Sequence, residues 1–94
     1  MKLPIHIYQA CEVDNQVVNV RRSAGDEVEW YSESDEFIVE FPITPFARDK
    51  FVVPARGSVK SGPVRVDAPI TLYRYGITNV ALAMSADPGL DVKP

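Results

Sequence analysis

The sequence predicts an all-β fold, a single-domain antiparallel Greek-key β-sandwich that covers residues 1–94. Apolar side chains recur at every second position rather than with helical spacing. Eight prolines and five glycines are spread along the chain and leave no window for a convincing helix. Turn signals separate about seven or eight short apolar segments, a pattern typical of a sandwich of two sheets.

Composition and charge argue against nucleic acid and membrane as partners. A chain of 94 residues with 46% apolar residues has the size and hydrophobicity of one folded domain. A net charge of −3 gives no support for nucleic-acid binding, which usually needs a basic face. No apolar run approaches the roughly 20 residues that span a bilayer, so no membrane partner is expected. The start of the chain lacks a secretory signal, which predicts a cytoplasmic location if Met1 is the natural start.

The first segment is expected to be a strand that carries Ile5, Ile7, Cys11 and Val13 on one face, with Gln9 as the exception. A single cysteine excludes an internal disulfide bond. Because Cys11 shares the parity of the isoleucines, the pattern predicts a buried and inert thiol.

Residues 18–20 predict a second strand, and the turn at residues 25–26 leads into a third at residues 27–31. In the third strand the aliphatic and indole side chains alternate with Glu27 and Glu29. That alternation is typical of a strand with one wet face, so both glutamates should keep ordinary pKa values.

Residues 36–41 predict a fourth strand, which Pro42 and Pro45 end because proline cannot donate a hydrogen bond to a sheet. In the loop at residues 42–50, Phe46 is expected to cover the core. A short strand at residues 51–53 follows.

Two weaker segments lie around Val59 and at residues 64–66. The clearest late strand is residues 70–77, with Arg74 facing outward, and residues 90–92 form a terminal strand. Residues 80–84 are compatible with a helical turn or with part of a strand. The side chains expected to form the core between the sheets are Trp30, Phe37, Phe41, Tyr73 and Tyr75.

Several short motifs occur in a recognisable order between residues 17 and 92. They are Gly25-Asp26 before Val28-Glu29-Trp30, the polar corner Ser34-Asp35 before Phe37–Phe41, Pro45-Phe46, Ser61-Gly62-Pro63, the pair Tyr73 and Tyr75, and a closing Asp87 to Val92. In this order and spacing the chain resembles the cupredoxins, small β-sandwiches that usually carry a blue copper ion. An immunoglobulin-like sandwich is the alternative fold.

The resemblance also implies where copper ligands would stand. A blue copper site needs two imidazoles, one thiolate and a weak axial thioether. The first histidine would fall near residues 35–37, and the remaining ligands near Ile77, Val80 and Met84. Only the methionine is present, so the resemblance implies a copper-free member whose site is filled by packed side chains, Met84 included.

Other chemistry finds little support in the sequence. A rearranged metal site could use His6, Cys11 or Met84, but His6 and Cys11 have opposite parity in the first segment. One histidine and one cysteine form no recognisable nucleophile–base pair, so the chain is not expected to be an enzyme. No catalytic, cofactor-binding or metal-binding residue is therefore assigned, and no cofactor is expected.

Charge is distributed unevenly along the chain. Residues 23–47 carry seven acids and no base, whereas residues 48–74 carry six bases and two acids. Either neighbouring strands pair opposite charges, or two patches of opposite sign attract a partner. The leading hypothesis is a non-enzymatic protein-binding or interaction module that engages another protein or itself, through a sheet edge or these charges. The alternative is a metal-handling protein with the rearranged site.

Overall fold

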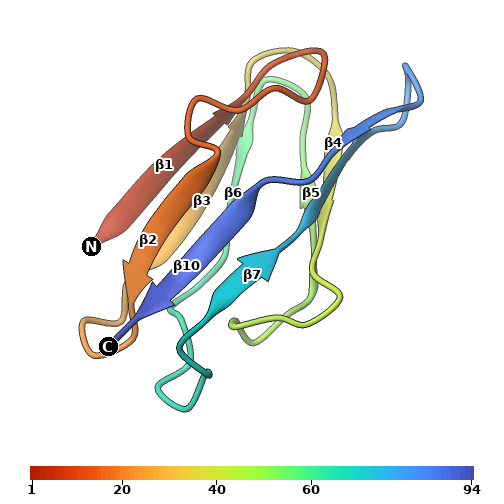
Figure 1. Ribbon diagram of the computed structural model, residues 1–94. Helices are drawn as coiled ribbons and strands as arrows, with labels where there is room; N and C mark the ends of the chain where they lie inside the picture. Colours follow the sequence, from red (N-terminus) through yellow and green to blue (C-terminus); the bar gives the residue numbers. More distant parts are fainter.

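The computed structural model describes all residues 1–94 and contains ten strands and no helix (Figure 1). No helix long and apolar enough to cross a membrane is present. The strands are β1 (Lys2–Ile7), β2 (Val17–Arg21), β3 (Glu27–Ser32), β4 (Phe37–Glu40), β5 (Lys50–Val53), β6 (Ser58–Lys60), β7 (Leu72–Arg74), β8 (Gly76–Asn79), β9 (Met84–Ala86) and β10 (Gly89–Lys93).

The strands form two layers, as expected for a β-sandwich. Sheet I has the order β1-β3-β6, and it lies behind the strands β2, β10 and β7 in Figure 1. Sheet II consists of two hydrogen-bonded halves, with the orders β2-β10-β7 and β5-β4-β8-β9. The predicted all-β sandwich is therefore confirmed.

The two halves of sheet II are joined by one long hairpin, in which β7 continues into β8 and β9 continues into β10. Tyr73 lies opposite Leu90, and Ile77 lies opposite Ala86, so a single antiparallel register runs through both halves. The Tyr75 amide donates to the Pro88 carbonyl at 3.2 Å and keeps that register across the interruption. The base of the hairpin pairs with β2, and the half nearer its tip pairs with β4.

Two strand pairs correct the expectation of antiparallel pairing throughout. β1 runs parallel to β3, and β2 runs parallel to β10. Parallel neighbours need long connections, and residues 8–16 and 22–26 with their flanking strands carry the chain between the layers. Alternation within a strand predicts which side faces the core, but it does not predict the direction of the neighbouring strand.

The core lies between the two sheets and is built around Trp30. This indole contacts Phe41, Phe46, Phe51 and Tyr75, with ring centroids 5.0–6.4 Å apart. Such tilted and edge-on arrangements are favourable for aromatic pairs. All five side chains predicted for the core are buried, and Phe46 covers the core as expected.

Several predicted segments differ from the structure. β1 ends at Ile7, and the chain turns at Cys11, where φ is 63°, so Cys11 is buried but lies in a loop rather than in the first strand. Residues 64–66 form no strand. Residues 80–83 are the exposed turn of the long hairpin, and Met84 begins β9.

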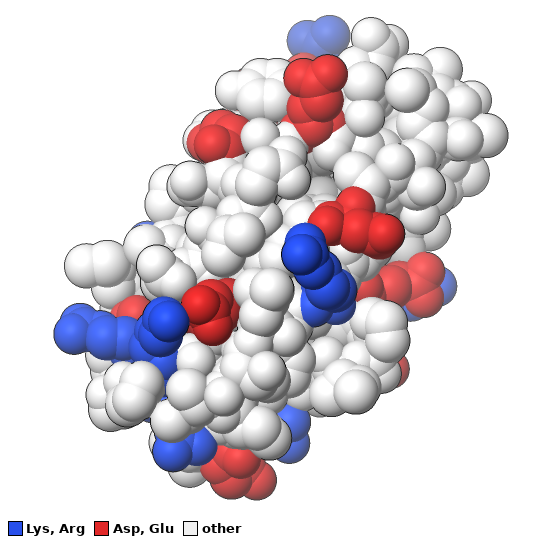
Figure 2. Space-filling view, viewed as in Figure 1, with Lys and Arg blue, Asp and Glu red and all other residues white.

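The fold places some of the acidic residues opposite basic residues on neighbouring strands. Glu29 lies opposite Lys60, and Glu40 lies opposite Lys50. On the face that carries β2, β10 and β7, acidic and basic side chains are interspersed (Figure 2). These observations favour the interpretation in which neighbouring strands bring opposite charges together.

Candidate functional site

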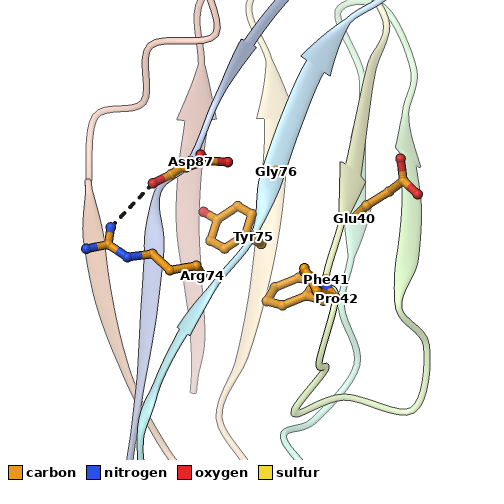
Figure 3. A pocket seen from close by; sticks show the side chains of 7 residues that line it. All are labelled: Glu40, Phe41, Pro42, Arg74, Tyr75, Gly76 and Asp87. Carbon is orange, nitrogen blue, oxygen red and sulfur yellow. Dashed lines mark hydrogen bonds between the residues drawn. The ribbon is translucent and has the colours of Figure 1, made fainter.

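The largest hollow of the molecule has a volume of about 660 Å³ and opens on the outer face of sheet II, where β4 separates from the long hairpin. Figure 3 shows its lining side chains, which come from the end of β4, from the junction of β7 and β8, and from the link between β9 and β10. The lining residues are Glu40, Phe41, Pro42, Arg74, Tyr75, Gly76 and Asp87.

The separation of β4 from the hairpin has a cause in the sequence. Glu40 lies opposite Gly76 in the register between β4 and β8. Two steps further along this register, Pro42 would lie opposite Arg74. Since proline has no N–H to donate, β4 cannot continue as a paired strand beside β7. The chain leaves the sheet at this point, and the predicted end of the strand at Pro42 is confirmed.

The departure of β4 leaves one edge of β7 without a neighbouring strand. The Tyr75 amide donates to Pro88, and the Thr71 carbonyl accepts from the Val92 amide, so the backbone groups of the odd-numbered residues face β10. Hydrogen-bonding directions alternate along a strand, and the N–H and C=O groups of Leu72 and Arg74 therefore face the opposite side. β7 is thus an open edge.

A second hollow, of about 350 Å³, runs along this open edge. It lies between β7 and the segment that follows β4, and it is lined by Pro42, Ile43 and residues 71–74. Pro42 and Arg74 line both hollows, so the two hollows are adjacent. We call the pair of hollows the β7 groove.

The inner wall of the larger hollow is aromatic and rigid. The rings of Phe41 and Tyr75 are stacked, with centroids 4.8 Å apart and an interplanar angle of 24°. Tyr75 also contacts Trp30, whose Nε1–H donates to the Tyr75 hydroxyl at 3.4 Å. Burial raises the pKa of Tyr75 to about 12, so this hydroxyl is protonated and takes no part in acid–base chemistry near neutral pH.

The rim of the hollow is charged. Glu40, Arg74 and Asp87 are exposed, and the guanidinium of Arg74 donates to the main-chain carbonyl of Asp87 at 3.4 Å (Figure 3). Neither the Glu40 nor the Asp87 carboxylate takes part in an ion pair or accepts a hydrogen bond. The arrangement offers main-chain donors and acceptors and two free carboxylates, but no nucleophile held by a base.

On the outer face of sheet I the carboxylate of Glu29, unlike those of Glu40 and Asp87, is surrounded by hydrogen-bond donors. Glu29 is only 7% exposed, and it accepts hydrogen bonds from Lys2 and Ser58 at 2.7 Å and from the Tyr31 hydroxyl at 2.8 Å. These bonds, first that from Lys2, lower the pKa of Glu29 from 4.5 to about 2. The expectation of an ordinary pKa is wrong for Glu29, because donors on both neighbouring strands converge on it.

Of the three residues of the rearranged metal site, the fold separates His6 from Cys11 but places Cys11 against the main chain of Met84. The His6 ring lies on the outer face of sheet I, stacked on Tyr31 at 4.9 Å, and its Nδ1 lies 2.7 Å from Glu33. Cys11 lies in the core, where its thiol donates to the main-chain carbonyl of Met84 at 3.4 Å and burial raises its pKa. No group of three or more His, Cys, Asp or Glu side chains is arranged to hold a metal ion.

The positions that would hold copper in a cupredoxin are only partly packed. Phe37 and Ile77 are fully buried. Val80 is 58% exposed and Met84 is 39% exposed, because both belong to the projecting tip of the long hairpin. The expectation of a filled site is therefore correct at Ile77 and wrong at Val80 and Met84.

In sequence, the chain matches no protein-family model and none of the curated proteins.

The sequence identified Pro42 as a strand end and Arg74 as outward-facing, but it did not predict the hollow around Gly76. The signal was a glycine inside a strand pattern, which often marks a close approach of another backbone.

Proposed function

We propose that the protein is a non-enzymatic protein-binding module and that the β7 groove receives an extended segment of its partner. The observation that carries this proposal is the open edge of β7 beside two adjacent hollows. The backbone groups of Leu72 and Arg74 are hydrogen-bonding groups that the fold leaves unused, and an added strand would satisfy them. The cupredoxin-like resemblance stays part of this proposal, supported by the order of the sequence motifs and by the two-layered sandwich.

The chemistry of the groove suits such a ligand. An antiparallel or parallel segment beside β7 forms main-chain hydrogen bonds that do not depend on its sequence, while its side chains meet the two hollows. Ile43 and Leu72, which are 75% and 41% exposed, provide apolar contacts along the groove. The edge is only three residues long, which limits uncontrolled pairing between copies.

The test uses the whole protein and a displayed library of random peptides. Peptides enriched by the wild-type protein are measured against Arg74→Pro, which removes an edge N–H that the fold does not use, and against Arg74→Ala, which keeps that N–H. We expect binding to weaken at least about tenfold in the proline variant relative to the alanine variant. Thermal unfolding of both variants verifies that each is folded.

Two results would contradict the proposal. One is a library from which no peptide is enriched. The other is a set of peptides that bind the proline and alanine variants equally well, because such peptides would not use the edge of β7.

A further inference from the structure

A residue without a side chain, Gly76, lies at the centre of the larger hollow. Gly76 faces outward from β8, and its neighbours across the sheet are Glu40 on one side and Asp87 on the other. A Cβ atom at Gly76 would meet only the Asp87 carboxylate, at 3.9 Å. Neighbouring strands lie about 4.8 Å apart, so the two acidic residues stand about 10 Å apart across an empty position.

No cation of the protein occupies this position. The five ion pairs of the molecule involve other carboxylates. Arg74 is turned toward the Asp87 main-chain carbonyl, on the side of the hollow away from Glu40 (Figure 3). Lys50 lies opposite Glu40, on the side away from Gly76, and forms no ion pair.

The walls below the carboxylates are apolar. Phe41, Pro42 and Tyr75 line the hollow beside the glycine. A lysine or arginine side chain matches this arrangement, because its alkyl stem packs on apolar surface while its charged head stays near carboxylates and water. An acidic side chain would meet like charge there.

We infer that the hollow around Gly76 binds a basic side chain, lysine or arginine, of the segment that docks in the β7 groove. This inference rests on the proposed function, since it names the residue class that the partner segment carries. Complementary charge at the groove then gives the module its selectivity, while the main-chain edge gives it affinity for extended segments in general.

The direct test uses two small probes rather than a partner. Nα-acetyl-arginine amide and Nα-acetyl-citrulline amide have nearly the same shape, and only the first is charged. In ¹H–¹⁵N spectra of the whole protein, we expect the arginine probe to shift the amide resonances of Gly76 and its neighbours with an affinity at least about fivefold higher than that of the citrulline probe.

Matched variants show which carboxylates cause the difference in affinity between the two probes. Glu40→Gln with Asp87→Asn should abolish the difference between the probes. Glu12→Gln with Glu36→Gln neutralises two exposed carboxylates elsewhere and should leave the difference intact. Equal affinities of the two probes for the wild-type protein, or shifts confined to another surface, would overturn the inference.

The peptide library separates this inference from the proposed function. Peptides that require the β7 edge but carry no fixed lysine or arginine would overturn the inference and leave the function standing. Specific binding of the arginine probe at Gly76, without any edge-dependent peptide, would support the basic-residue site and contradict strand docking.

Discussion

Glu29 and Glu40 each face outward from a central strand, one in each sheet, and the fold treats them in opposite ways. Each lies on the outer face of a strand that has a neighbour on both sides. Glu29 is closed in by Lys2, Tyr31 and Ser58. Glu40 has Gly76 on one side and Lys50 on the other, forms no ion pair, and remains exposed. The donors that converge on Glu29 from its own and the neighbouring strands have no counterpart at Glu40, so one carboxylate is closed in and the other stays exposed.

The backbone of β7 differs from the other edges by what lies beside it. In sheet I the outer strands β1 and β6 also pair with one neighbour only, the central strand β3, but none of the hollows along β7 adjoins them. In sheet II the strand β7 is paired only with β10, because Pro42 ends β4 two residues too early to cover it. The fork between β4 and β7 is therefore the region to which we assign the proposed function.

The largest loss of stability is expected at Trp30, the side chain on which the packing of both sheets depends. Trp30 is fully buried and contacts the aromatic wall of the hollow from the inside. Trp30→Ala should lower the free energy of unfolding by about 3–5 kcal/mol, because it removes a large side chain from a close-packed core. Chemical denaturation measures this, with the exposed Val52→Ala as control. A loss below about 1 kcal/mol would mean that the sheets do not pack around Trp30.

The next largest loss of stability should distinguish Glu29 from Glu40. Glu29→Gln should lower the midpoint of thermal unfolding clearly, because the ammonium of Lys2 loses the carboxylate to which it donates. Glu40→Gln should change the stability by no more than about 0.5 kcal/mol, as is usual for an exposed side chain that forms no ion pair or hydrogen bond. Equal losses in the two variants would contradict the distinction between the closed and the open face.

A smaller effect concerns pH. The folded-state pKa of Glu29 is lowered from 4.5 to about 2, first by the hydrogen bond from Lys2, so the ionised carboxylate stabilises the folded state. This contribution is fully present above pH 4.5 and is lost as the pH falls toward 2. The difference in stability between the wild type and Glu29→Gln should therefore shrink over this range. Denaturation at a series of pH values checks the trend, and a constant difference would contradict it.

Much of the fold follows from local sequence pattern. Alternation predicted β3 and β4 and the inward faces of Trp30 and Phe37, because side chains of a half-buried strand alternate between core and water. Direction and register of the neighbouring strands did not follow, since they depend on residues far apart in the chain. The parallel pairing of β1 with β3 is the clearest example.

The candidate site was harder to predict for the same reason. Gly76 and Glu40 are 36 positions apart and become neighbours only through the register of β8 with β4. Asp87 joins them through the long hairpin, and the sequence pattern left residues 80–84 of that hairpin open between a helical turn and a strand. The local signals were present at Pro42 and Gly76, but their meaning depends on which strands they separate.

Hydrogen exchange of the amides along β7 tests the central claim most directly, because it requires no ligand. The account predicts that the amides of Leu72 and Arg74 exchange at least about tenfold faster than those of Tyr73 and Tyr75, which face β10. Uniform slow exchange along residues 72–75 would show that the edge is already covered, and it would contradict the proposal that the β7 groove is open to a partner.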